Sequence, residues 1–149
     1  MDRIKTRHRV LGTLLFLLYL AALVYFLFFA EALGRDAGSE YHYNLVLFRE
    51  IRRFWMYRDK LGWNAFLLNT AGNVAAFLPF GFFLPFVLGR RHVFPEVLLL
   101  GILFSASVET LQLITRLGSF DVDDILLNVI GAVLGHLIFR IFNRRFRSV

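Results

Sequence analysis

Polar and acidic side chains interrupt two long apolar stretches of this chain. Asn69 and Asn73 lie in one stretch, and Glu109 and Gln112 lie in the other. A carboxylate near the centre of a bilayer costs about 2.5–3.5 kcal/mol on insertion scales, so it usually faces a partner, a cavity or a ligand. These residues can form hydrogen bonds with a polar ligand, and Glu109 can also act as a general base.

A further polar group precedes the last apolar stretch. Asp121, Asp123 and Asp124 follow one another closely, and Asn128 lies four residues after Asp124. Two interpretations stay open. The acids form a hydrated turn in which Asp123 or Asp124 caps the following helix, or they contact a ligand or a divalent ion. Three acids in a turn are a weak metal signal, so we assign no metal site.

Four long stretches with no charge, or with a single acid, indicate the fold class. The chain has 149 residues, of which 58% are hydrophobic. A soluble domain of this composition would leave too much apolar surface in water. Crossing a hydrocarbon core of about 30 Å takes roughly 20 helical residues. We therefore predict an all-α integral membrane protein with four transmembrane helices, at about 10–31, 66–88, 95–115 and 124–142.

Basic residues gather at three places that four membrane helices would bring to one side. These residues are Arg3, Lys5, Arg7 and Arg9, then Arg90 and Arg91, then Arg140, Arg144, Arg145 and Arg147. The positive-inside rule places all three segments, and hence both termini, in the cytoplasm. We expect residues 1–9 to form a basic cytoplasmic N-terminus and residues 10–149 a single membrane domain. The first helix should be retained, because its apolar run exceeds the roughly 7–15 residues of a signal peptide.

This orientation places the polar residues at one depth in the membrane. At ~1.5 Å per helical residue, Asn73 lies roughly 10 Å and Glu109 about 9 Å from the outer edge. Asp124 and Asn128 begin the last helix at the same level and, being four residues apart, share a helix face. We predict a polar pocket that opens to the outer face. Its expected ligand-binding residues are Asn69, Asn73, Glu109, Gln112, Asp121, Asp123, Asp124 and Asn128.

Some of these positions also have a purely structural interpretation. Amides such as Asn69 and Gln112 often serve only to join membrane helices, at about 0.6 kcal/mol each. Gly131 and Gly135 form a G-x-x-x-G pair that lets another helix backbone approach closely. That approach can occur within one molecule or between two copies, so a homo-oligomer stays open.

An amphipathic helix is expected at about residues 44–58, in the first extracellular loop. Apolar residues recur there at helical spacing, with charged residues on the opposite face. We predict that this helix lies in the membrane interface. It either anchors the loop or binds phosphate or acidic headgroups on the outer leaflet. The candidate headgroup-binding residues are Arg49, Arg52 and Arg53.

Three motifs together resemble the VanZ-like family. They are the segments Asn69–Gly81, Ser105–Gln112 and Phe120–Gly135, and with Asn44-Leu45 they cover about residues 44–139. Many members carry an arginine directly before the Phe-Asp pair, where this chain has Gly118-Ser119; whether Arg116 replaces it stays open. The resemblance implies a multi-pass protein of the bacterial cytoplasmic membrane that is linked to the cell envelope. Some members of the family are associated with antibiotic resistance, specifically to teicoplanin, and the resemblance implies the same association as an expectation for this chain.

Two functions stay open. The first is a non-enzymatic envelope protein whose pocket binds a lipid-linked or lipid-tailed ligand. Its partners are membrane lipids and a lipid-linked cell-wall intermediate or a lipoglycopeptide, with no nucleic acid. The second is an intramembrane enzyme acting on a lipid-linked substrate, with Glu109 or Asp124 as general base or with a metal ion held by the three aspartates. We favour the first, because no serine–histidine pairing or phosphate-binding glycine loop is present. We therefore assign no catalytic residue and no cofactor.

Overall fold

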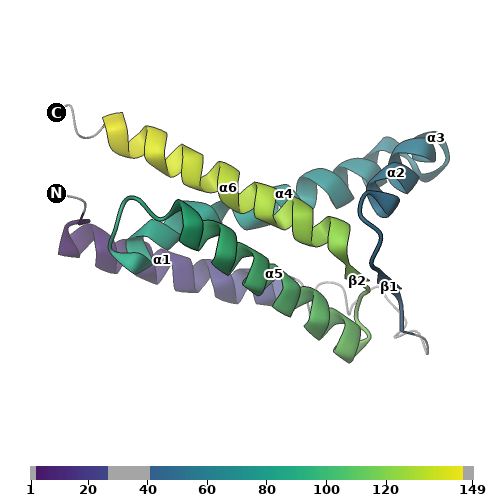
Figure 1. Ribbon diagram of the computed structural model, residues 1–149, viewed down its shortest axis with the longest axis horizontal. Helices are drawn as coiled ribbons and strands as arrows, with labels where there is room; N and C mark the ends of the chain where they lie inside the picture. Colours follow the sequence, from purple (N-terminus) through teal and green to yellow (C-terminus); the bar gives the residue numbers. More distant parts are fainter. Residues whose placement is uncertain (1–2, 27–40, 146–149) are drawn as a thin grey trace.

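Four long helices dominate the part of the chain that the computed structural model describes, residues 3–26 and 41–145. The elements are α1 (Thr6–Tyr25), β1 (Tyr43–Asn44), α2 (Arg49–Met56), α3 (Arg58–Leu61), α4 (Trp63–Leu88), α5 (Phe94–Thr115), β2 (Phe120–Asp121) and α6 (Val122–Arg145). Within these residues, α1, α4, α5 and α6 are long and apolar enough to cross a membrane. The predicted helical fold with four candidate spans is therefore confirmed (Figure 1).

The helix boundaries differ from the predicted ones by a few residues. α1 begins at Thr6 rather than at residue 10, and α4 begins at Trp63 rather than at residue 66. The predicted end of the first helix, residue 31, lies outside the described residues. α5 begins at Phe94, so that Pro95 lies in its first turn. Proline is tolerated there, because the N–H groups of a first turn have no partner within the helix.

α6 packs most extensively on α4, and glycine makes this close approach possible. A Cβ on Gly131 would lie 2.2 Å from the Val74 carbonyl oxygen, and one on Gly135 would lie 1.9 Å from the Leu78 carbonyl oxygen. Both distances are far below van der Waals contact. The predicted G-x-x-x-G pair is thus used inside the monomer, against the α4 backbone.

α1 covers another face of α4. A Cβ on Gly12 would lie 2.4 Å from the Phe86 ring, so the small residue lets the two helices meet. The Tyr19 hydroxyl donates a 2.7 Å hydrogen bond to the Ala76 carbonyl oxygen. The bond therefore holds α1 against the turn of α4 that lies before Pro79. In this part of α4 the helix lacks one backbone N–H donor, because proline has none.

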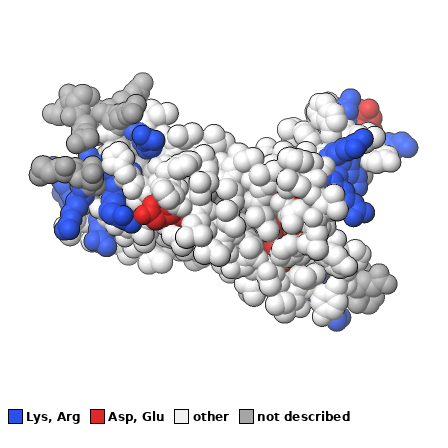
Figure 2. All heavy atoms as spheres, viewed as in Figure 1, with Lys and Arg blue, Asp and Glu red and all other residues white. Residues whose placement is uncertain are grey.

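Both termini lie at one end of the bundle, together with the turn between α4 and α5 (Figure 1). The Ile4 N–H donates to the Gly89 carbonyl oxygen at 3.1 Å, and Arg3 and Arg90 form an isolated β-bridge. Figure 2 shows Lys and Arg gathered at this end and over α2 and α3. The cytoplasmic location of the termini stays a prediction.

The helix expected over residues 44–58 is shorter than predicted. Asn44 instead lies in β1, which pairs in parallel with β2. The chain then turns through Phe48, whose φ of 64° is left-handed, before α2 begins at Arg49. This pairing joins segments far apart in the sequence, so local periodicity does not reveal it. Of the apolar residues that suggested an interfacial helix, Trp55 is exposed, whereas Ile51 and Phe54 are half-buried. The place of this helix in the membrane interface stays a prediction.

Candidate functional site

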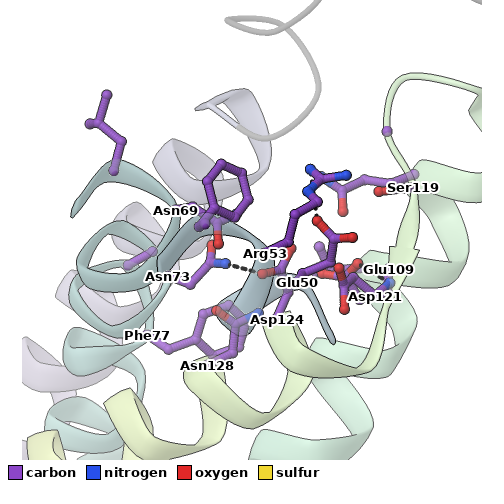
Figure 3. Close-up of a pocket in the computed structure, with 16 residues that line it drawn as sticks. Glu50, Arg53, Asn69, Asn73, Phe77, Glu109, Ser119, Asp121, Asp124 and Asn128 are labelled. Atoms are coloured by element: carbon purple, nitrogen blue, oxygen red, sulfur yellow. Dashed lines mark hydrogen bonds and ion pairs between the residues drawn. The ribbon is translucent and has the colours of Figure 1, made fainter. Parts of the chain in front are cut away.

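A cavity of about 460 Å³ lies where α2, α4, α5, α6 and the turn after α5 meet (Figure 3). We call it the acidic cavity. Seven of the eight predicted ligand-binding residues line it. They are Asn69, Asn73, Glu109, Gln112, Asp121, Asp124 and Asn128. Four of them, Glu109, Gln112, Asp121 and Asn128, are buried.

One side of the acidic cavity is formed by polar residues of α4 and α6. The Asn73 side-chain nitrogen donates a 2.6 Å hydrogen bond to an Asp124 carboxylate oxygen, which joins the two helices across the cavity (Figure 3). Asn69 lies one helical turn before Asn73, on the same face. Its side-chain oxygen is buried and has no hydrogen-bond partner among the described residues.

The other side is formed by α5, β2 and α6. The Asn128 amide donates a 2.9 Å bond to the Ser105 hydroxyl, while its own oxygen is buried without a partner in the described part of the chain. Glu109 accepts a 3.1 Å bond from the Asp121 backbone N–H. This bond ties the carboxylate of the membrane helix to the strand that precedes α6.

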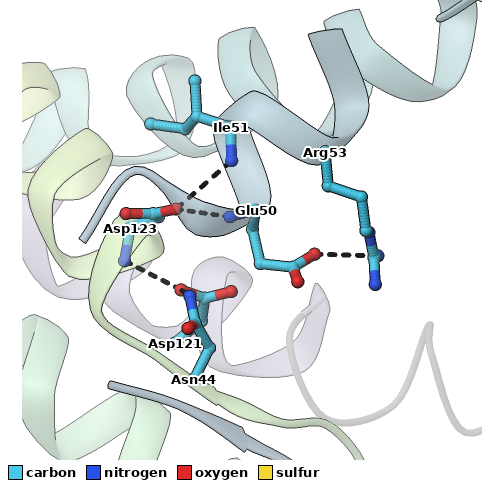
Figure 4. A network of polar contacts seen from close by, with 6 residues as sticks. All are labelled: Asn44, Glu50, Ile51, Arg53, Asp121 and Asp123. Carbon is cyan, nitrogen blue, oxygen red and sulfur yellow. Dashed lines mark hydrogen bonds and ion pairs between the residues drawn. The ribbon is translucent and has the colours of Figure 1, made fainter. Parts of the chain in front are cut away.

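Asp123 has a different role from the ones expected. It does not line the acidic cavity and is only 1% exposed. Its carboxylate accepts hydrogen bonds from the backbone N–H groups of Glu50 (2.8 Å) and Ile51 (3.2 Å), and also from that of Phe48. The first N–H groups of a helix have no partner within the helix. Asp123 therefore caps α2 rather than its own helix (Figure 4).

Asp121 is held by a network that begins in β1. Its Oδ1 accepts bonds from the Asn44 side-chain nitrogen at 3.0 Å and from the Asp123 N–H at 2.8 Å (Figure 4). The Asn44 oxygen accepts in turn from the Val46 N–H at 3.1 Å. Burial raises the pKa of Asp121 above its ordinary value, although these two bonds and the nearby Arg53 charge act to lower it. The neutral form of Asp121 is thus favoured more than in water.

α2 contributes Glu50 and Arg53 to the acidic cavity. The two side chains form a 2.8 Å ion pair, and the Arg53 side chain is 55% exposed, so the pair is screened by solvent and contributes little stability. Arg49 and Arg52, the other two candidate headgroup-binding residues, do not line the cavity. Among its described lining residues, Arg53 is the only one with a positive charge.

Arg116 does not reach the acidic cavity. Its guanidinium lies 4.6 Å from the centre of the Tyr41 ring and 3.3 Å from the Tyr41 hydroxyl. Gly118 and Ser119 line the cavity at the positions before the Phe-Asp pair. The arginine of the cavity therefore comes from α2 instead of from the turn after α5. In residues 3–26 and 41–145, no group of three His, Asp or Glu side chains is arranged to hold a metal ion.

The sequence prediction missed several lining residues. Glu50 was assigned to the charged face of an interfacial helix, although its spacing of three residues from Arg53 is a visible sign of pairing. Apolar wall residues carry no such sign, because apolar side chains occur throughout the chain. They include Phe54, Leu68, Phe77 and Val108.

Comparison with protein-family models finds a match to VanZ/LLP1 over residues 16–143. The matched region contains α4, α5, all of α6 except its last two residues, and every lining residue of the acidic cavity. No curated protein and no solved structure matches the chain.

Proposed function

This chain belongs to the VanZ/LLP1 family and is a multi-pass membrane protein, and from that premise we propose that it binds a ligand without transforming it. The ligand is a lipid-linked or lipid-tailed molecule whose polar headgroup enters the acidic cavity. The observation that carries this proposal is the convergence of buried and half-buried amides and carboxylates from three membrane helices on one cavity. Buried polar groups are costly in a membrane unless they are paired or have a use.

The charges of the acidic cavity favour a headgroup that donates hydrogen bonds. Glu50, Glu109, Asp121 and Asp124 line it, against a single cation, Arg53, among the described lining residues. The unpartnered side-chain oxygens of the lining amides are acceptors as well. A phosphate deep in the cavity would meet carboxylates without compensation. We therefore assign the cavity to hydroxyl, amide or amine groups, such as those of a sugar or a peptide.

A phosphate in the same ligand fits only beside Arg53. This side chain lines the acidic cavity and is also largely exposed, so it is accessible from the surface. Arginine binds phosphate through two parallel N–H bonds. Of the three arginines predicted to bind headgroups, we therefore retain Arg53 in this role.

An apolar tail has a route beside the headgroup. Leu68 lines the acidic cavity and is also 75% exposed on the side of α4. In a bilayer this side of α4 faces hydrocarbon, which supports lateral entry of a ligand that stays anchored by its tail. Binding of this kind on the outer leaflet lowers the access of lipoglycopeptides such as teicoplanin to their membrane-borne targets. Reduced susceptibility in a bacterial cell is the expected phenotype.

An intramembrane enzyme is the second candidate. The observation that favours it is the nearly complete burial of Glu109, which is 3% exposed within an apolar helix. Buried carboxylates of this type act as acids or bases in catalysis. The metal-assisted form has less support, because Asp123 already accepts three backbone N–H bonds.

Native mass spectrometry of gently solubilised protein tests the binding proposal. We expect a co-purifying amphiphile on the wild type and its loss, by about two- to tenfold, in Asn73→Ala, because this change removes an amide whose hydrogen bond contributes about 0.5–1.5 kcal/mol. Ser107→Ala is the matched control, because the Ser107 hydroxyl is exposed and donates to the Leu103 carbonyl oxygen of its own helix. If wild type and Asn73→Ala carry the same molecules in the same amounts, the cavity is not the binding site.

Glu109→Gln separates the two candidates. The substitution keeps the shape of the side chain and removes its charge and basicity. For a binding protein we expect retention of the amphiphile to fall severalfold, because a hydrogen bond to a charged group contributes about 1 kcal/mol more than one to a neutral group. For an enzyme, substrate stays bound and accumulates unchanged on the variant, while product disappears. Comparing the masses bound to wild type and variant distinguishes these outcomes.

A further inference from the structure

A second cavity, of about 310 Å³, lies at the opposite end of the bundle from α2. Its walls come from the start of α1, the end of α4, the turn before α5 and the end of α6. This is the end where both termini lie and where Lys and Arg gather in Figure 2. We call it the basic cavity. It shares no lining residue with the acidic cavity.

The charges of the basic cavity have the opposite sign to those of the acidic one. Lys5 and Arg91 line it with positive charge, His8 lines it as a hydrogen-bonding group, and no described lining residue is acidic. The Nε of Arg91 is buried without a hydrogen-bond partner among the described residues. Glu96, an acid at this end of the bundle, pairs with Arg90 at 2.7 Å.

The backbone of α1 adds to this positive field. Lys5 is the N-cap residue of α1; no side chain caps the helix, and its first turn contains no acid. The amino end of a helix carries partial positive charge and N–H groups without a helical partner, which suit an anion. An anion in the basic cavity thus meets cationic side chains and the amino end of a 20-residue helix.

The rest of the basic cavity is aromatic. Phe86, Phe139 and Phe142 line it, and the rings of Phe86 and Phe139 lie 5.2 Å apart in an edge-to-face arrangement. A small inorganic anion gains nothing from such a wall. An anionic group attached to a hydrocarbon chain gains both the charge contacts and burial of its apolar part.

We propose that the basic cavity binds the phosphate headgroup of an anionic membrane lipid. The phosphate lies between Lys5, His8 and Arg91, and the first part of the lipid tail lies against the three phenylalanine rings. This site is independent of the ligand proposed for the acidic cavity. It holds lipid at the end of the bundle that carries both termini.

The test uses the purified full chain and two lipids with identical tails, phosphatidylglycerol and phosphatidylcholine, followed by native mass spectrometry. We expect phosphatidylglycerol to be retained severalfold more than phosphatidylcholine. Arg91→Gln should reduce this retention about fivefold, the effect of one basic residue near an anionic headgroup. Arg91→Lys should restore most of it. Equal retention of the two lipids by the wild type would overturn the proposal.

Matched controls separate a site from a diffuse positive surface. Arg7→Gln removes the same charge from an exposed position on α1 that does not line the basic cavity. It should leave retention nearly unchanged, and a loss equal to that in Arg91→Gln contradicts a defined site. Phe142→Ala should weaken retention more than Ile141→Ala, whose side chain is exposed and lies outside the lining.

Two further measurements complete the test. Excess inorganic phosphate should leave the lipid bound; full displacement would identify a site for free phosphate instead and contradict the role of the rings. Asn73→Ala should not change phosphatidylglycerol retention, because Asn73 lines only the acidic cavity. This readout keeps failure of the present proposal distinct from failure of the one for the acidic cavity.

Discussion

The Asp123 carboxylate accepts backbone N–H bonds from Phe48, Glu50 and Ile51, which belong to a segment more than 70 positions earlier in the chain. An N-cap side chain normally accepts such N–H bonds at the start of its own helix. Here the two Asp123 oxygens accept them at the start of a different helix, α2. These bonds tie the start of α2 to α6 and so help to set the position of Arg53 at the acidic cavity. Asp123 is in this sense a positioning residue for the cavity.

We predict that Asp123→Ala loosens α2 without removing any lining residue of the cavity. Losing a cap costs about 0.5–2 kcal/mol, so hydrogen exchange at the Glu50 and Ile51 amides should speed up about two- to thirtyfold. Asp59→Ala, which removes an exposed acid from α3, is the control and should leave these amides unaffected. Unchanged exchange in Asp123→Ala would mean that α2 is held by other contacts.

The contact between α4 and α6 determines how close the residues of the acidic cavity lie. Gly131 and Gly135 let the two backbones touch, so that the Asn73 side-chain nitrogen lies 2.6 Å from the Asp124 carboxylate oxygen. A larger residue in this seam separates the helices and lengthens the bonds across the cavity. The small-residue seam and the polar site are therefore one structural unit.

We predict that Gly135→Ala destabilises the bundle by about 1–3 kcal/mol, since overpacking a tight contact has this cost. The new Cβ would lie 1.9 Å from the Leu78 carbonyl oxygen. Gly72→Ala on α4 is the control, because a Cβ there meets nothing within 4 Å and alanine favours a helix over glycine. Thermal unfolding in detergent measures both. Equal melting temperatures would show that the seam can relax.

Elements with a local cause were predictable from the sequence, and those with a distant cause were not. Uncharged stretches of about 20 residues indicated the four long helices, and the spacing of Asn69 and Asn73 placed two amides on one face of α4. The break of the expected outer helix before Arg49 depends on pairing with β2, which no local pattern records. For the same reason the sequence did not reveal that Asp123 caps α2.

At the level of the whole molecule, the two cavities lie at opposite ends of the bundle and have opposite charge. Arginine and lysine at the end with both termini favour a cytoplasmic location for that end. If this holds, the acidic cavity faces the outer leaflet and the basic cavity faces the inner one. The two proposed ligands then come from different leaflets.

Labelling of single cysteines with a membrane-impermeant thiol reagent tests this orientation, and the chain itself contains no cysteine that would add background. Ser119→Cys marks the end with the acidic cavity, and His92→Cys marks the turn between α4 and α5; both positions are exposed. We expect intact cells to label Ser119→Cys, and His92→Cys only after permeabilisation, because the positive-inside rule places the arginine-rich turn in the cytoplasm. The reverse pattern would place the acidic cavity at the inner leaflet. A role in shielding outer-leaflet targets from lipoglycopeptides would then be excluded, whereas binding in either cavity would still be decided by the mass-spectrometric tests.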